Sequence, residues 1–217
     1  MKKNIFIAII FIMSLNTTFG QSLNSLNWLN EPEQWNISDN RLTLQVTPQT
    51  DFWNKTHYGF TVNDGPFLFA KRSGEFEVTA KLTGKYKTRF DQMGLMFRID
   101  NNHWIKTGIE YVDGVYNFST VHTINHSSWS VVALKEKPKS IWIKAIRKVD
   151  AIEIFYSLDG TNYQMSNIVY FPEHRSIEVG MMAASPDGDG FEATFEDFKI
   201  KHTPDSRRLE WLKNNQE

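Results

Sequence analysis

The sequence contains no cysteine among its 217 residues. A disulfide framework, thiolate catalysis and cysteine-ligated zinc are therefore excluded. Beyond the amino-terminal segment it also lacks any run of about 20 apolar residues, the length that a transmembrane helix needs. The formal net charge is only −1. With so small a surplus of either sign, neither nucleic acid nor an anionic membrane surface is expected as a partner.

The first 20 residues have the pattern of a secretory signal peptide. Lys2 and Lys3 precede the apolar run Ile5–Leu15, and small residues near Gly20 suit a cleavage site. The run is too short to span a membrane comfortably. We expect cleavage near Gly20 and a secreted or periplasmic mature protein, whose net charge moves from −1 to −3 with the loss of two lysines.

The rest of the chain predicts one all-β domain over residues 24–202, followed by a tail over 203–217 with no assigned role. Short alternating stretches recur between turn residues, and no long amphipathic helix intervenes, a pattern typical of an antiparallel β-sandwich. Strands are expected at Arg41–Thr47, Gly74–Leu82, Asp91–Ile99, Ile141–Arg147, Ala151–Ser157, Ser176–Ala184 and Gly190–His202, and loops at Gln49–Phe60 and His126–Ser130.

The stretch Asp91–Thr123 predicts three antiparallel strands whose pairing is set by their turns. Asp100–Asn102 suits a three-residue hairpin loop, and Asp113-Gly114 is a strong two-residue hairpin signal. Because directly opposed residues share a face, the registers divide the strands into an apolar face and a polar face. The polar face gathers the candidate ligand-binding residues Gln92, Gly94, Trp104, Lys106, Gly108, Glu110, Asn117 and Ser119.

Two glycines, Gly94 and Gly108, are predicted to face one another in the middle of the polar face. Glycine inside a strand often marks close approach by a ligand or by another backbone. One interpretation is a hollow that holds a small polar ligand, which Gly108→Val would fill at little cost in stability. The other is that an aromatic residue of the loop Gln49–Phe60 covers the glycines.

Carbohydrate binding requires a shallow cleft, aromatic surfaces and a few planar polar groups. Trp53, Trp104 and Trp129 are the candidate aromatic surfaces. For Trp53 and Trp129 the alternative is that they plug an end of the sandwich as part of the core.

Several short motifs follow one another in a characteristic order. They are Asn30-Glu31-Pro32, Asp51-Phe52-Trp53, Asp91-Gln92-x-Gly94, Trp104-Ile105-Lys106-x-Gly108-x-Glu110-Tyr111, Ser128-Trp129-Ser130 and Ser185-Pro186. Together they resemble the concanavalin A-like domains of the regulation-of-enolase-protein-1 family, whose function is largely unknown, from about Leu26 to His202. The resemblance implies a jelly-roll sandwich with a concave face, in a superfamily of lectins and glucanases. The segment 142–160 is also similar to lectin-like modules found beside glycoside hydrolases.

Related retaining glucanases carry a Glu-x-Asp-x-Glu strand motif, and this sequence lacks it. Glu110 is the single candidate acid on the polar face, although a loop or strand end could bring Asp51 or Asp91 towards it. Asp187 and Asp189 could hold calcium through oxygen ligands, but their loop lacks EF-hand spacing and an ordinary acidic turn is the alternative. No other cofactor is expected.

These observations favour an exported, non-catalytic, lectin-like module that binds a carbohydrate or small polar ligand on the concave sheet face. The alternatives are a glycoside hydrolase or polysaccharide lyase that relies on Glu110, and a structural domain that binds a protein partner. A second carboxylate about 5–10 Å from Glu110 across an open cleft would favour hydrolysis. A single acid beside an exposed tryptophan would favour binding.

Overall fold

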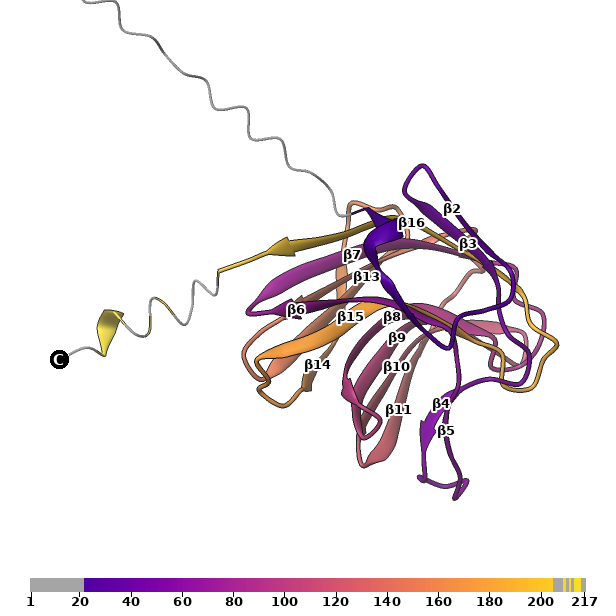
Figure 1. Cartoon of the computed structure of the whole chain (residues 1–217), viewed down its shortest axis with the longest axis horizontal. Coiled ribbons are helices and arrows are strands. Elements are labelled where there is room, and N and C mark those ends of the chain that lie inside the picture. Colours follow the sequence, from indigo (N-terminus) through magenta and orange to yellow (C-terminus); the bar gives the residue numbers. More distant parts are fainter. Residues whose placement is uncertain (1–21, 205–208, 210, 212, 216–217) are drawn as a thin grey trace, which may run out of the picture.

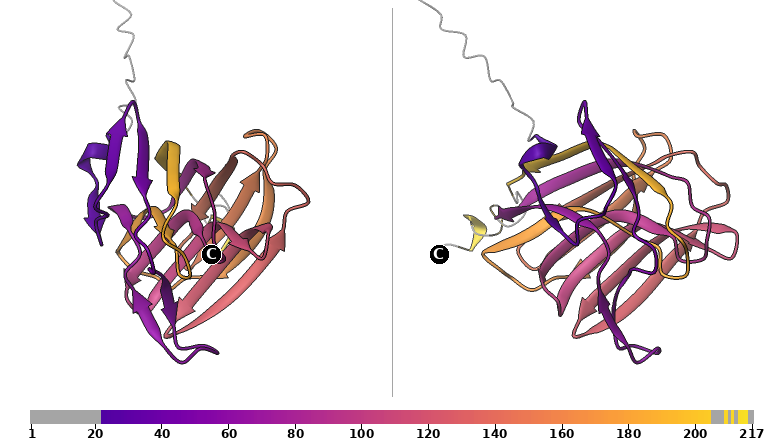
Figure 2. Two further views of the ribbon diagram at one scale, coloured as in Figure 1. Left: turned by 90° about the vertical axis from the view of Figure 1, so that its right-hand side faces the viewer. Right: turned by 45° about the vertical axis from the view of Figure 1, so that its right-hand side comes forward.

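The computed structural model describes residues 22–204, 209, 211 and 213–215. The expected signal peptide, residues 1–20, lies outside the described residues, as does part of the tail. The described chain forms two sheets packed face to face (Figure 1). Figure 2 shows the same two layers from two further directions.

Each sheet has seven strands, and every pair of neighbouring strands is antiparallel. Sheet A contains, in spatial order, β1 (Asn27–Leu29), β6 (Phe67–Ser73), β15 (Ser176–Ala184), β8 (Gln92–Asp100), β9 (His103–Val112), β10 (Val115–Ile124) and β11 (His126–Ala133). Sheet B contains β14 (Gln164–Tyr170), β13 (Ala151–Ser157), β12 (Ile141–Arg147), β7 (Phe76–Gly84), β16 (Glu192–His202), β3 (Arg41–Gln45) and β2 (Trp35–Ser38). The predicted antiparallel, jelly-roll-type β-sandwich is confirmed.

Two small elements lie outside these sheets. A 3-10 turn, η1 (Leu23–Ser25), precedes β1, and its Leu23 is buried in the core. A two-stranded hairpin consists of β4 (Phe52–Asn54) and β5 (Thr61–Asn63).

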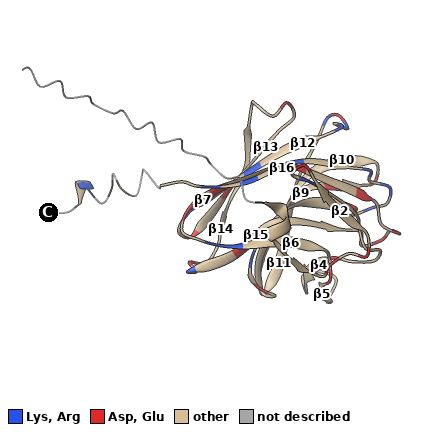
Figure 3. Ribbon diagram, turned by 45° about the horizontal axis from the view of Figure 1, so that its top comes forward, with Lys and Arg blue, Asp and Glu red and all other residues tan. Residues whose placement is uncertain are grey.

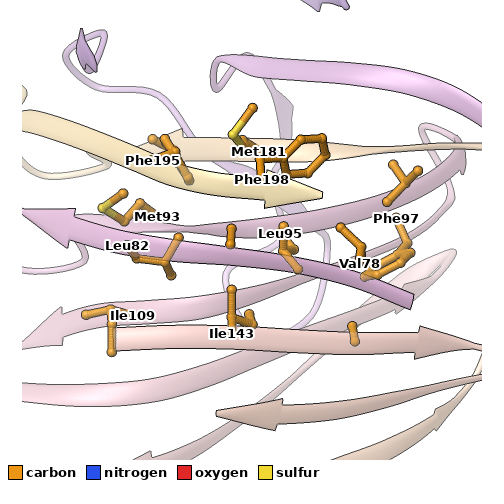
Figure 4. Close-up of a cluster of buried hydrophobic side chains, with 14 of the residues drawn as sticks. Val78, Leu82, Met93, Leu95, Phe97, Ile109, Ile143, Met181, Phe195 and Phe198 are labelled. Atoms are coloured by element: carbon orange, nitrogen blue, oxygen red, sulfur yellow. The ribbon is translucent and has the colours of Figure 1, made fainter. Parts of the chain in front are cut away.

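The hydrophobic core lies between the two sheets, because alternate residues of each strand point to the same face. Figure 4 shows side chains from both sheets meeting there. Sheet B contributes Val78, Leu82, Ile143, Phe195 and Phe198, and sheet A contributes Met93, Leu95, Phe97, Ile109 and Met181. Full burial of such a side chain contributes about 1.5–3 kcal/mol each, so this layer is the main source of stability.

The registers predicted for the three central strands of sheet A are confirmed. Gly94 pairs with Gly108, and Gln92 pairs with Glu110. On the next strand Glu110 pairs with Asn117. The predicted apolar face therefore faces sheet B, and the predicted polar face is the outer face of sheet A.

Some expected elements were wrong. His126–Ser130 is not a loop but the first part of the edge strand β11, where Ser130 pairs with Thr120 and Ser128 with His122. An edge strand made of small polar residues is hard to predict, because one side of it has no partner strand and its alternation of apolar and polar residues is weak. The expected loop Gln49–Phe60 contains β4, and the strands β6 and β14 were not predicted.

The outer face of sheet A also carries a second, smaller hydrophobic cluster, which we call the outer cluster. It is made by buried residues of β4 and of the sheet strands beneath it: Phe52, Trp53, Phe67, Met96, Trp104, Val121, Met182 and Ala184. The β4–β5 hairpin therefore covers part of this face and leaves the rest accessible.

In the ribbon of Figure 3, positions of basic and of acidic residues occur in both layers of the sandwich. Among the residues that the structure describes, no helix is long and apolar enough to cross a membrane.

Candidate functional site

A cleft of about 210 Å³ lies on the outer face of sheet A, beside the β4–β5 hairpin. Its aromatic lining residues are Trp53, Tyr58, Phe60, Phe90 and Trp129. Its polar and remaining lining residues are Asp51, Gln92, Lys106, Glu110, Val121, Pro186 and Asp187. The cleft thus combines aromatic surfaces with a few polar groups, which is the composition of a small-molecule site.

The hairpin is fixed to sheet A through Asn54, the last residue of β4. The backbone N–H of Asn54 donates to Ser127 Oγ at 2.8 Å, and Asn54 Nδ2 donates to the carbonyl oxygen of Asn101 at 2.9 Å. Trp53 Nε1 donates to the carbonyl oxygen of Thr56 at 2.9 Å, so its ring orientation is set by the hairpin itself. These bonds hold one aromatic wall of the cleft over the sheet.

Asp51, at the start of the hairpin, forms a largely buried ion pair with Lys106 of β9. Lys106 Nζ lies 2.6 Å from Asp51 Oδ1. The same oxygen accepts hydrogen bonds from the backbone N–H of Phe52 at 2.7 Å and from Gln92 Nε2 at 3.3 Å. The lysine charge is therefore compensated inside the site, and the pair fixes the hairpin relative to the sheet.

Glu110 lies farther along β9 and is only 5% exposed. Its Oε2 accepts a hydrogen bond from Trp129 Nε1 at 2.7 Å, and the same indole N–H lies 3.0 Å from Ser119 Oγ. Burial raises the pKa of Glu110 above its ordinary value, and the negative charge of Asp51 adds to this. The positive charge of Lys106 and the hydrogen bonds from Ser119 and Trp129 oppose the rise without cancelling it.

Phe90 forms the wall next to Trp129 and has an unusual backbone conformation. Its φ is 66°, in the left-handed region where a bulky residue is a genuine outlier. The backbone N–H of Phe90 donates to the carbonyl oxygen of Tyr111 at 2.7 Å, and its own carbonyl oxygen accepts from Gln92 Nε2 at 3.2 Å. The ring meets Trp129 edge-on, with centroids 6.3 Å apart. Strained residues of this kind cluster at ligand sites.

Asp91 is fully buried and supports the cleft from behind. One carboxylate oxygen accepts from the backbone N–H groups of Lys87 at 2.7 Å and Thr88 at 2.9 Å, and the other from Ser185 Oγ. Phe90, which precedes Asp91, and Pro186, which follows Ser185, both line the cleft. Asp91 therefore positions loops, and it is Asp51 that reaches the polar face.

The expected hollow over Gly94 and Gly108 is occupied by backbone packing, and this prediction was wrong. A Cβ on Gly94 would lie 1.9 Å from the carbonyl oxygen of Thr107, and one on Gly108 would lie 2.1 Å from that of Met93. The space beside Gly108 is about 10 Å³, and Met182 lines it. A space of that size holds at most one water molecule. The two glycines allow β8 and β9 to approach closely.

Trp104 was expected to present an aromatic surface, and the structure corrects this. The side chain is 0% exposed and belongs to the outer cluster, where it meets Phe52 edge-on. Trp129, in contrast, is 43% exposed. The predicted residues Gln92, Lys106, Glu110, Trp53 and Trp129 come together around the cleft. Ser119 reaches it only through Trp129, and Asn117 is buried beside it without lining it.

The expected calcium loop gains no support. Asp187 lines the cleft, whereas Asp189 does not. Within the described part of the chain, no group of three or more acidic or histidine side chains could hold a metal ion.

The sequence interpretation did not select Asp51, Tyr58, Phe60, Phe90 or Pro186 as ligand-binding residues. The aromatic density of the segment 49–60 was a usable signal for the first three. For Phe90 and Pro186 we find no signal apart from their adjacency to Asp91 and Ser185, which hold them in place.

The fold and the cleft together define a concanavalin A-like sandwich protein with a ligand-sized site on one sheet face. The model of a family described as "Protein of unknown function (DUF1349)" matches residues 28–203, and the chain belongs to this family. It is 32% identical over 189 residues to Regulation of enolase protein 1 from Saccharomyces cerevisiae, covering 87% of this chain and 93% of that protein. The resemblance noted from the motifs is confirmed.

Solved structures agree with the fold. A functionally unknown protein from Saccharomyces cerevisiae has a TM-score of 0.82 at 31% identity, covering 85% of this chain and 100% of that one. A GH43 protein from Bacillus licheniformis has a TM-score of 0.64 at 14% identity, covering 84% of this chain and 39% of that one. The carbohydrate binding module CBM66 from Bacillus subtilis has a TM-score of 0.52 at 13% identity, covering 81% of this chain and 95% of that one. At these low identities the two Bacillus structures show the fold alone.

Proposed function

We propose that this protein binds a small carbohydrate in the cleft between the β4–β5 hairpin and β11, without catalysing a reaction. The observation that carries this proposal is the pairing of two aromatic walls with planar polar groups on the cleft floor. Tyr58, Phe60 and Trp129 are each about half exposed and can pack against the C–H surface of a sugar ring. Gln92 and Glu110 can bond to its hydroxyl groups.

The size of the cleft limits the ligand. A volume of about 210 Å³ is below the roughly 300–1,000 Å³ of sites for drug-sized molecules, and it suits one or two sugar rings. The likeness in fold to the CBM66 module supports the same class of ligand.

Hydrolysis is the second candidate, because Asp51 and Glu110 both line the cleft and burial raises the pKa of Glu110, as a general acid requires. The engagement of Asp51 speaks against it. One oxygen of Asp51 already accepts from Lys106, Gln92 and the backbone of Phe52. A carboxylate held in this way is suited to fixing the hairpin rather than to attacking a sugar carbon or activating water.

We also propose that binding takes place outside the cytoplasm, on the basis of the signal-peptide pattern over residues 1–20. An exported sugar-binding protein would meet its ligand in the periplasm or the medium.

The test is a glycan array with the purified protein, followed by calorimetric titration of each hit. Trp129→Ala is expected to weaken binding at least about tenfold, because it removes an exposed aromatic wall. Tyr170→Ala, an exposed aromatic on strand β14 of sheet B that does not line the cleft, is the control and should bind as the wild type does. An array without hits, or equal effects of the two variants, would overturn the proposal. Release of reducing sugar from a hit would establish hydrolysis in place of simple binding.

A further inference from the structure

The cleft carries more negative than positive charge. Its lining includes three carboxylates, those of Asp51, Glu110 and Asp187, and the ammonium of Lys106. Lys106 is already paired with Asp51. In the part of the chain that the structure describes, neither Glu110 nor Asp187 forms an ion pair with a basic side chain. The single ammonium of Lys106 thus acts on both Asp51 and Glu110, and the described lining of the cleft keeps a surplus of negative charge.

The aromatic walls also favour a positively charged ligand. Trp53, Tyr58 and Phe60 stand on the hairpin, where Tyr58 meets Trp53 edge-on and stacks on Phe60, with ring centroids 5.7 Å apart in both pairs. Phe90 and Trp129 form the other wall, with centroids 6.3 Å apart. The guanidinium carbon of Arg89 already lies over the Phe90 ring, 4.5 Å from its centroid, which leaves the ring of Trp129 as the main surface of this wall for a ligand cation. The faces of aromatic rings attract cations, and a cage of several rings is the known means of holding an ammonium group.

We propose that the cleft selects a sugar that carries an ammonium group, an amino sugar, over neutral and acidic sugars of the same size. The aromatic walls would surround the ammonium group, while Glu110 and Asp187 balance its charge. A uronic acid would place a further negative charge beside them. This inference rests on the proposed sugar-binding function and adds its charge selectivity.

The protonation of Glu110 provides a second way to detect binding of a cation. The charged groups that act on its carboxyl are Lys106 and Asp51, and Asp187 lines the same cleft. Because burial raises the pKa of Glu110, its carboxyl loses its proton over a range of pH higher than that of an ordinary glutamate. A bound cation favours the ionised carboxylate, so binding should release protons and strengthen as pH rises through this range.

The experiment is calorimetric titration of the full protein with three matched sugars and one non-sugar cation. Glucosamine carries the ammonium group, N-acetylglucosamine is its neutral counterpart, glucuronic acid is the anion, and choline tests the cation alone. Glucosamine is expected to bind about tenfold more tightly than N-acetylglucosamine, and glucuronic acid more weakly than both. Titration in buffers of different ionisation enthalpy should show proton release for glucosamine.

Two substitutions locate the effect. Glu110→Gln keeps an acceptor for Trp129 Nε1 while removing the charge, and it should bring the affinity ratio of glucosamine to N-acetylglucosamine towards one. Asp187→Asn, at an exposed position, is the second variant and should lower the same ratio without disturbing the fold. Asp150→Asn, on the exposed turn between β12 and β13, is the matched control and should leave the ratio unchanged.

The outcomes separate the two proposals. If N-acetylglucosamine binds as tightly as glucosamine, charge selectivity is overturned while sugar binding stands. Choline binding in the absence of any sugar binding would overturn the proposed function and support selection of a cation. If none of the four compounds binds, selection of an amino sugar is overturned, while the glycan array decides the proposed sugar binding separately.

Discussion

The outer face of sheet A has two halves with similar residues and opposite environments. Around Trp104 the face is covered by Phe52, and the tryptophan is fully buried. Around Trp129 and Glu110 the face opens into the cleft. Both tryptophans lie on the same side of the same sheet, so the strands alone do not decide which one is accessible. The hairpin β4–β5, about 40 or more residues earlier in the chain than either, decides it by covering one half.

The sharpest test of this comparison is to remove each tryptophan in turn. Trp104→Ala should lower the free energy of unfolding by about 3–5 kcal/mol, because it leaves a large cavity in the outer cluster. Trp129→Ala should cost less, about 1–3 kcal/mol, since its side chain is half exposed but its indole N–H bonds to the buried Glu110 carboxylate. Urea unfolding of both variants measures the difference. Equal losses of stability would mean that the two halves are equally packed.

The next test concerns the glycines beneath the outer face. Gly108→Val should lower the free energy of unfolding by about 3 kcal/mol, because its side chain would meet the backbone carbonyl of Met93, which cannot move aside. Urea unfolding measures it, with the exposed Val131→Ala on β11 as a control expected to change little. If Gly108→Val instead keeps the stability of the wild type but no longer binds ligand, the expected hollow over Gly94 and Gly108 would be supported after all.

The smallest expected effect is the change in stability with pH that the buried Glu110 carboxyl causes in the open half. The folded protein holds the Glu110 proton more tightly than the unfolded chain does, because burial raises the pKa of this carboxyl. As pH rises from the ordinary pKa of glutamate through the raised value, the folded state binds more protons than the unfolded state and its stability falls. Glu110→Gln removes this loss. The variant should therefore gain stability relative to the wild type over the range that begins at the ordinary pKa of glutamate, about 4.3, and extends through the raised pKa of Glu110.

Urea unfolding at several pH values across that range measures this gain. Asp150→Asn serves as the remote control. If the free energy of unfolding changes with pH in the same way for the wild type and Glu110→Gln, burial of this carboxyl does not destabilise the folded protein.

The fold was predictable where alternation and turn chemistry are strong. Asp113-Gly114 and the Asp100–Asn102 loop set both registers of the central strands, and these registers placed Gln92, Lys106 and Glu110 on one face. Edge strands such as β11 and β14 were harder, because half of their surroundings is solvent and their pattern is weak.

The site was predictable only in part, for a physical reason. Polar residues on adjacent strands come together through register, which the sequence encodes locally. The ion pair of Asp51 with Lys106 joins residues of different elements through tertiary packing, and so does the burial of Trp104 beneath Phe52. The sequence therefore identified the correct face and several of its residues, but it did not separate the covered half from the open half.

The edge strand β11 also has a consequence for association between chains. It pairs with β10 on one side only, and its exposed Trp129, Val131 and Val132 form a short apolar template for pairing with another chain. No Asp, Glu, Lys or Arg lies within His126–Ala133. The segment 135–139, Lys-Glu-Lys-Pro-Lys, begins after Leu134, one residue beyond the end of β11, and charges and proline beside an apolar strand disfavour such association in general. The strand that carries Trp129 into the lining of the cleft is thus also an unpaired sheet edge, followed by a segment of lysines and a proline.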